Sequence, residues 1–210
     1  MNHQAQPTKI LARLRSLNPP RGLDERTALS IAERQATLLL ELTGALAAPV
    51  PIRLLTQLPR IELARTQLPT SGVSYWTGSA WRLECNRAEP MVRQRFTLAH
   101  EFKHVIDHPL RDLLYADHGA RERVADHFAA CLLMPKRLVV RAWCSGEQDL
   151  TQLAELFVVS TEAMSRRLAT LGLSDQRLPR PLRCSRGMRR SLRPAPAFAI
   201  AGRESIGVKR

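Results

Sequence analysis

Apolar residues between positions 24 and 44 follow the spacing of one face of an α-helix. They recur three or four residues apart, at Leu29, Ala32, Ala36, Leu39 and Leu40. Asp24 can accept hydrogen bonds from free backbone N–H groups at the start, and Gly44 permits the left-handed conformation that ends many helices. The pattern therefore predicts a long amphipathic helix over this segment.

The second half of the chain predicts further helices. One runs from about residue 91 to 108 and stops before Pro109, and another runs from about 120 to 134 and stops before Pro135. Residues 150–173 show two short helical patterns joined by a tight turn, which is the rhythm of a helix-turn-helix unit. Helices thus dominate this half of the chain.

Residues 72–86 instead alternate between apolar and polar positions with a period of two. Alternating runs on both sides of the turn residues Thr77-Gly78-Ser79 predict a β-hairpin. The preceding segment, residues 48–72, contains four prolines and suits short elements and turns. A small sheet beside several helices places the chain in the α+β class.

These patterns divide the chain into four parts. Residues 1–22 are polar and basic and end in two prolines, which indicates a flexible N-terminal arm. Residues 23–145 contain the hairpin and the long helices and form the main domain, and residues 146–175 form the helix-turn-helix-like unit. Residues 176–210 are rich in Arg, Pro and Ser without apolar periodicity, which predicts a disordered tail.

The net charge of +13 is concentrated at the C-terminus. Residues 177–210 hold ten Lys or Arg and one acidic residue, so they carry +9 and the other 176 residues only +4. A near-neutral body is not typical of a dedicated nucleic-acid binder, whereas the tail offers weak, unspecific contact with nucleic-acid phosphates. The N-terminus lacks the apolar core of a secretion signal, so we expect a cytoplasmic protein with no membrane partner.

The segment HEFKH contains the strongest candidate for chemistry. Residues four apart lie on one helix face, so His100 and His104 can present two imidazole nitrogens to one metal ion. Glu101 follows the first histidine and can take a proton from a water molecule beside the metal. Polar ligands on an otherwise apolar helix indicate a zinc site, although histidines that are simply hydrogen-bonded in the core remain the alternative.

The third ligand decides which class of zinc site is present. The metzincin pattern fails, because it requires a histidine where the chain has Leu110. Downstream, Glu122 and Asp126 are four residues apart on the predicted helix over 120–134. Glu122 suits the third ligand position, and Asp126 suits a carboxylate that accepts the other N–H of a ligand histidine. The alternative for Glu122 is a solvated acid between Arg121 and Arg123.

Two residues of the connecting segment are weaker candidates. Tyr115 offers a hydroxyl donor that could stabilise a tetrahedral oxyanion. His118 lies just before the second ligand helix and either assists the oxyanion in the same way or has no role.

At this point the residues resemble a known family. The blocks RQRFTLAHEFKH and ADHFAACLLMP, and the closing LAELFVVSTEAMSRRLATLGL, are similar in order and content to the ImmA/IrrE family of metallo-endopeptidases. The resemblance covers about residues 28–173. It implies a small zincin-like core, in which the active-site helix lies beside a small β-sheet and a C-terminal helical unit follows. It also implies one zinc ion per chain held by His100, His104 and Glu122, with Glu101 as catalytic base.

Two functional hypotheses follow. Known members of the family cleave a repressor protein of the helix-turn-helix type, so the resemblance implies a zinc endopeptidase whose partner is such a repressor. The alternative is a DNA-binding regulator with a structural or sensory zinc site, which would read DNA through Arg166 and Arg167, predicted to point outward. A closed structural site would need a fourth protein ligand, whereas the sequence offers three and keeps Glu101, which favours catalysis.

Overall fold

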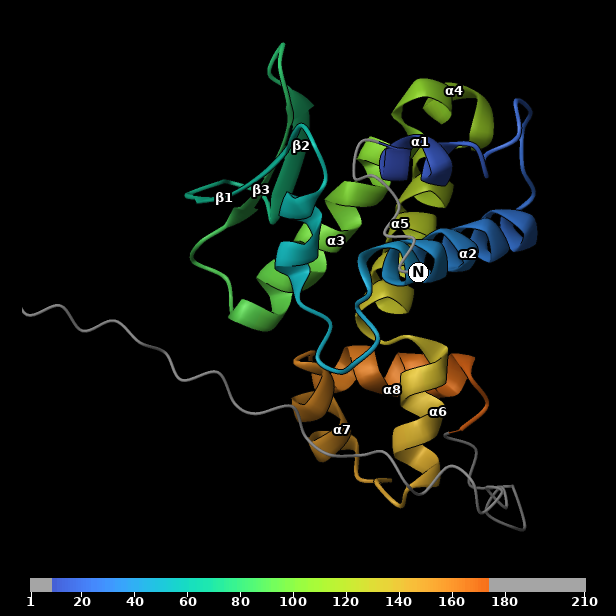
Figure 1. Ribbon diagram of the computed structural model, residues 1–210, viewed down its shortest axis with the longest axis vertical. Helices are drawn as coiled ribbons and strands as arrows, with labels where there is room; N and C mark the ends of the chain where they lie inside the picture. Colours follow the sequence, from blue (N-terminus) through green and yellow to red (C-terminus); the bar gives the residue numbers. More distant parts are fainter. Residues whose placement is uncertain (1–8, 174–210) are drawn as a thin grey trace, which may run out of the picture.

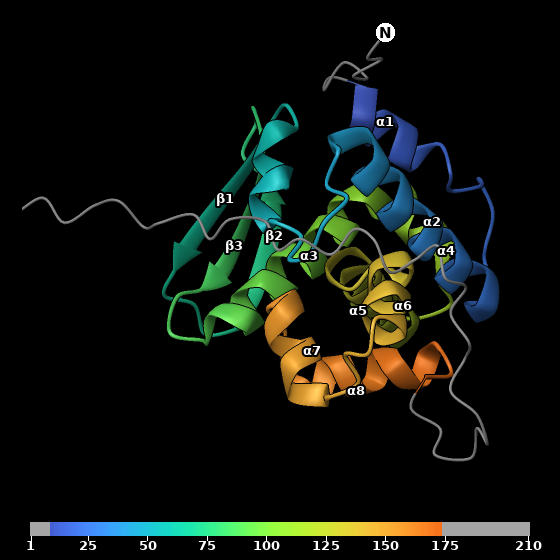
Figure 2. The ribbon, with the colours of Figure 1, turned by 60° about the horizontal axis from the view of Figure 1, so that its bottom comes forward.

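The computed structural model describes residues 9–173, and one long helix lies at its centre (Figures 1 and 2). This helix, α3 (Met91–Asp107), packs against the sheet on one side and against α5 (His118–Leu133) on the other. The helix α2 (Glu25–Thr43) covers the far side of α5. The α+β class and the small zincin-like core are therefore confirmed.

The sheet has three strands in the order β1-β3-β2. Strands β2 (Gly72–Trp76) and β3 (Trp81–Asn86) form the antiparallel hairpin predicted from the alternating pattern. Strand β1 (Ile61–Thr66) was not predicted, and it pairs with β3 in parallel. The hairpin therefore places β2 at one edge of the sheet, next to α3.

The long helices begin and end where local sequence chemistry dictates. Asp24 caps α2 by accepting a hydrogen bond from the backbone N–H of Thr27, and Gly44 ends it with a φ of 69°. Asp117 caps α5 in the same way. Between α3 and α5 the chain reverses through two short elements, η3 (His108–Leu110) and α4 (Arg111–Leu114).

The prediction of a flexible N-terminal arm over residues 1–22 is wrong for residues 9–22, the part of this segment that the structure describes. Residues Ile10–Arg15 form the helix α1, and Ile10 and Leu14 are buried in the core. Asn18 donates a hydrogen bond to the carboxylate of Asp107 at the end of α3, at 2.9 Å. Arg15 also donates to the carbonyl oxygen of Val105, so two apolar side chains and two polar ones anchor a segment whose composition is otherwise polar. Residues 1–8 lie outside the described part.

The C-terminal described segment contains α6 (Lys136–Cys144), α7 (Leu150–Phe157) and α8 (Thr161–Thr170). The turn between α7 and α8 places Val158 at a φ of 53° and Ser160 as the cap of α8. The guanidinium of Arg95, on α3, donates hydrogen bonds to the carbonyl oxygens of Val50, Phe157 and Val158. This buried arginine ties the α7–α8 turn to the central helix.

The prediction that Arg166 and Arg167 both point outward is wrong for Arg167. Its side chain is 2% exposed, and it lies 3.6 Å from Glu33 and donates to the carbonyl oxygen of Met134. Arg166 is exposed, and it pairs with Glu162 one turn earlier on α8. The segment thus presents one helix face with a single outward arginine, and that arginine already has an acidic partner.

The remaining short element is η2 (Ile52–Gln57), which leads into β1. Within residues 9–173, none of the helices combines the length and the apolar character that a bilayer crossing requires. The disordered tail predicted for residues 176–210 lies outside the described part of the chain.

Candidate metal centre

The apolar faces of α3 fix the direction in which its histidines point. Phe102, Val105 and Ile106 are fully buried, so the opposite face, which carries His100 and His104, is directed toward α5 and the cleft beside β2. Helix α5 runs antiparallel to α3 and brings Glu122 to the same place. Two successive predicted helices thus contribute one cluster of three ligand-type side chains.

The three side chains converge with the spacing of a coordination shell. His100 Nε2 lies 3.0 Å from His104 Nε2 and 3.1 Å from Glu122 Oε2, and His104 Nε2 lies 3.5 Å from Glu122 Oε1. Zinc ligands at about 2.0–2.1 Å in tetrahedral geometry are about 3.3–3.4 Å apart. The three donors therefore fit a single zinc ion, with one position left for a water molecule or a substrate atom.

The second nitrogen of His100 has its own partner. His100 Nδ1 lies 2.8 Å from Asp126 Oδ1, a hydrogen bond that fixes the ring and leaves Nε2 free to act as a ligand. Burial lowers the pKa of His100, but the hydrogen bond and charge of Asp126 outweigh it, so the pKa lies above its usual value. Burial and the neighbouring His100 lower the pKa of His104 to about 4. His104 is therefore a neutral imidazole, the form that binds metal ions.

Glu101 lies between the ligand cluster and the sheet. Its carboxylate accepts a hydrogen bond of 2.7 Å from the hydroxyl of Ser74 on β2, and burial raises its pKa. A carboxylate with a raised pKa, held beside three candidate metal ligands, is suited to accept a proton and return it. Ser74 was missed from the sequence, where the alternation of β2 was the only signal that it faces α3.

The close approach of β2 to α3 requires Gly72. A Cβ atom at this position would lie 2.3 Å from Thr97 Cγ2, 2.9 Å from the carbonyl oxygen of Glu84 and 3.3 Å from Glu101 Cγ. No other residue type fits without moving the strand, which makes Gly72 a structural part of the site. Sequence reasoning treated it only as the start of the hairpin.

The hydroxyl of Tyr115 is not free to stabilise an oxyanion at the ligand cluster. It donates a hydrogen bond to Asp107, and burial followed by the charge of Asp107 raises its pKa. Asp107 also accepts a 2.6 Å hydrogen bond from Lys103, and both side chains are almost fully buried. The hydroxyl proposed for an oxyanion is thus part of a buried network, completed by Asn18, that fixes the C-terminal end of α3.

His118 and Arg121 border the cluster on α5. His118 is exposed, and its Nε2 lies 3.6 Å from Glu122 Oε1, too far for a hydrogen bond. Arg121 Nε lies 3.5 Å from the same oxygen. The carboxylate of Glu122 is therefore not simply solvated, because His100, His104 and the guanidinium of Arg121 surround it.

A cleft of about 320 Å³ opens at the cluster. Its walls come from the start of β2, from α3 and from α5, and include Gly72, Thr97, His100, Glu101 and Glu122. Two of the candidate ligands, His100 and Glu122, thus share one solvent-accessible space with the candidate base Glu101, which a purely structural metal site would not need.

A second group of ligand-type residues is found among the described residues, formed by Glu33, His127 and Cys131. Burial raises the pKa of the Cys131 thiol to about 11, and burial and the charge of Arg167 lower the pKa of His127. Arg167 already pairs with Glu33 at 3.6 Å. A guanidinium that neutralises this group opposes a cation there, whereas Arg121 touches only one member of the first group.

Comparison with known families agrees with this geometry. Residues 60–169 match the family model for the IrrE N-terminal-like domain, a family of metallopeptidases. The match spans β1 through nearly all of α8 and includes every ligand candidate, which confirms the resemblance inferred from the sequence motifs. A search of curated protein sequences gave no significant match.

Proposed function

Because the chain belongs to the IrrE N-terminal-like domain family of peptidases, we propose that it is a zinc-dependent endopeptidase that cuts a regulatory protein. The observation that carries the proposal is the spacing of three ligand-type side chains, His100, His104 and Glu122, whose nitrogen and oxygen atoms lie 3.0–3.5 Å apart with Glu101 beside them. A structural zinc site would need a fourth protein ligand and no neighbouring proton acceptor.

Each side chain has a distinct role in the proposed reaction. His100, His104 and Glu122 hold the zinc, and Asp126 orients His100 through its second ring nitrogen. When bound, zinc supplies Lewis acidity toward a water molecule and the scissile carbonyl. Glu101 accepts the proton of that water and returns it to the leaving amine, while the hydrogen bond from Ser74 keeps its carboxylate in place.

The free edge of β2 offers a binding site for a peptide backbone. Its outer side has no neighbouring strand among the described residues, and its first residues line the cleft that contains Glu101. An extended segment can add to such an edge through main-chain hydrogen bonds. Folded proteins offer extended segments mainly in exposed loops and linkers, so we expect cleavage at one such site.

The partner that we propose is a repressor protein of the helix-turn-helix type. This identity rests on the resemblance to the ImmA/IrrE family and on no contact in this structure. DNA reading by α8 is less well supported, because Arg167 is buried and Arg166 pairs with Glu162. The tail of residues 176–210 remains a candidate for weak phosphate contact through its charge alone.

The test compares the unmodified chain with Glu101→Gln and His104→Ala on two substrates, casein and the repressor encoded nearest to the gene. We expect one zinc per chain, retained by Glu101→Gln without turnover and lost by His104→Ala, as measured by elemental analysis and fragment mapping. Normal cleavage by Glu101→Gln would refute the base assignment. Rapid digestion of casein with the repressor left whole would refute the regulatory role and indicate a general protease.

A further inference from the structure

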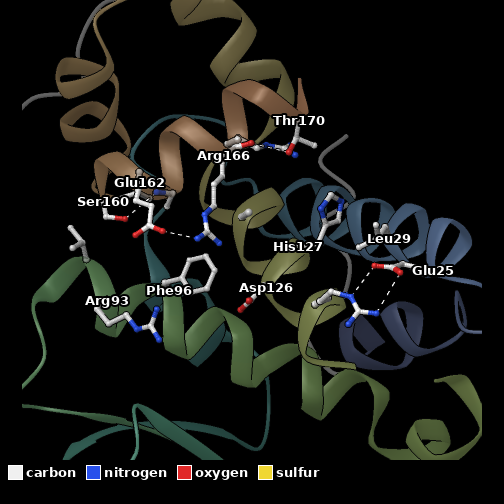
Figure 3. A pocket seen from close by; sticks show the side chains of 16 residues that line it. Glu25, Leu29, Arg93, Phe96, Asp126, His127, Ser160, Glu162, Arg166 and Thr170 are labelled. Atoms are coloured by element: carbon white, nitrogen blue, oxygen red, sulfur yellow. Dashed lines mark hydrogen bonds and ion pairs between the residues drawn. The ribbon is translucent and has the colours of Figure 1, made fainter. Parts of the chain in front are cut away.

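A second and larger cavity adjoins the cleft at the metal centre. It has a volume of about 550 Å³ and lies between α3, α5, the start of α2 and the length of α8 (Figure 3). Arg93, Phe96 and Asp126 line both cavities. Because Asp126 also binds His100, the larger cavity, here called the α8 groove, begins at the residue that orients a proposed ligand.

The direction of the α8 groove follows from the antiparallel pairing of α3 and α5. From His100 and Glu122, one helical turn leads to Phe96 and Asp126, and a second turn leads to Val92 and Ala130. Two turns of helix correspond to about 11–12 Å. An extended peptide covers about 3.3 Å per residue, so a substrate at the metal centre reaches this stretch about two to four residues from the scissile bond.

Two arginines that border the α8 groove are paired with acids that also border it, whereas Arg93 lies 4.0 Å from Glu89, outside the groove. Arg123 Nε lies 2.9 Å from Glu25, and Arg166 lies 2.6 Å from Glu162 (Figure 3). A charged ligand would have to compete with these partners. The apolar part of the lining is formed by Val92, Phe96, Ala130, Val159 and Ala163, and it adjoins the polar side chains of Arg93 and His127. This arrangement favours an apolar side chain over an acidic or a basic one.

The wall that α8 contributes is held firmly against the core. Arg95 binds the turn before α8 through the carbonyl oxygens of Phe157 and Val158, and Arg167 binds the carbonyl oxygen of Met134. Both arginines are buried. The face of α8 that would enter a DNA groove in a helix-turn-helix reader is here part of a fixed cavity wall.

We propose that the α8 groove receives a large apolar side chain of the polypeptide substrate, two to four residues from the scissile bond on one side. The helix-turn-helix-like segment then acts as a specificity wall for cleavage. This inference rests on the proposed endopeptidase function and adds the chemical class that the substrate must carry beside its cleavage site.

The first arm of the test narrows the α8 groove. Ala163→Trp fills it from α8, and Ala169→Trp is the matched control, because Ala169 is exposed on the same helix and does not line the cavity. The substrate is a peptide library made by tryptic digestion of a bacterial proteome, with cleavage sites read by mass spectrometry. We expect the unmodified chain and the control to prefer Leu, Ile, Phe or Met at the stated distance. Ala163→Trp should lose this preference and about 10-fold or more of kcat/KM on the preferred peptides.

The second arm measures binding without turnover. A benzophenone amino acid replaces Thr170, an exposed residue at the rim of the α8 groove, or Ala169 in the Glu101→Gln chain, and the same library is photo-crosslinked to each. We expect capture of peptides rich in large apolar residues from position 170 and little capture from position 169.

The two arms separate the failure of this inference from that of the proposed function. Cleavage with the same sequence preference in Ala163→Trp as in the unmodified chain overturns the role of the α8 groove and leaves the endopeptidase in place. Apolar capture at position 170, together with no cleavage of any peptide by the unmodified chain, supports apolar binding in the groove and overturns the endopeptidase. Crosslinking of position 170 to the chain's own residues beyond 173 also overturns the inference, since the groove would then hold the protein's own C-terminal segment.

Discussion

Replacing Gly72 by alanine tests the close contact between β2 and α3 on which the site depends. The added Cβ would lie 2.3 Å from Thr97 Cγ2 and 2.9 Å from the carbonyl oxygen of Glu84. Carbon atoms in ordinary contact are about 3.5–4.0 Å apart, so strand and helix must separate by more than about 1 Å. Neither neighbour yields easily, because one belongs to a buried helix residue and the other to the backbone of β3.

We expect Gly72→Ala to lower the free energy of unfolding by about 2–3 kcal/mol, at the upper end for overpacked sites. With a denaturant slope of about 2 kcal/mol per molar urea, the midpoint should fall by about 1–1.5 M. The separation also moves Ser74 away from Glu101, so proteolytic activity should fall while the zinc content stays at one per chain. Thr97→Ser in the same chain removes the methyl group of the closest contact and should restore part of both losses.

Gly22→Ala is the matched control. A Cβ at Gly22 meets only the carbonyl oxygen of Leu113, at an ordinary 3.5 Å, and its φ is not in the left-handed region. This change should be neutral or stabilising by up to about 1 kcal/mol, because alanine restricts the unfolded chain. If Gly72→Ala unfolds at the same urea concentration as the unmodified chain, β2 does not press on α3, and the role of Gly72 in the site is refuted.

Three further predictions follow from the same contacts. Glu122→Ala should remove most of the zinc affinity, and Asp126→Asn should lower it by about 10–100-fold, as measured by competition with a chelator. If Glu122→Ala binds zinc as tightly as the unmodified chain, the third ligand is another residue. Arg95→Met should lower the free energy of unfolding by about 2–4 kcal/mol, because the carbonyl oxygens of the α7–α8 turn lose their hydrogen-bond donor. The same change should accelerate proteolytic cleavage between α6 and α7, and an unchanged cleavage rate would contradict the prediction. The hydroxyl of Thr66 lowers the pKa of Glu84, so this carboxylate stabilises the fold above its unfolded pKa and the contribution is lost as pH falls through the lower folded value. Urea midpoints from about pH 6 to about pH 3 should therefore fall less steeply in Glu84→Gln than in the unmodified chain.

The elements that local chemistry specifies were predictable from the sequence. Asp24 and Gly44 delimit α2, and the two alternating runs around Gly78 give the hairpin. Strand β1 was not predictable in the same way, because its six residues follow Pro59 and its only partner, β3, lies fifteen residues further along the chain. Parallel pairing depends on this distant contact and leaves no local turn signal.

In the candidate site too, some features follow from the local sequence and others depend on contacts between distant elements. The spacing of His100 and His104 follows from the helix period, so the pair was predictable from the sequence alone. The partners of Tyr115 and Arg167 were not, because each is set by residues on other elements, Asp107 and Glu33. The direction of each of these side chains therefore depends on an acid contributed by another element and not on its own position in the sequence.

The packing of α1 and α2 against the core limits how the chain can be truncated. The segment that matches the family begins at residue 60, so it contains neither helix, yet α2 covers α5 and α1 packs on α2 and α3. A recombinant fragment limited to residues 60–169 would leave Phe128 and its neighbours on α5 without their cover and should aggregate. The matched half of the sequence is therefore not expected to fold as an independent unit, because α5 packs against a helix that precedes the match.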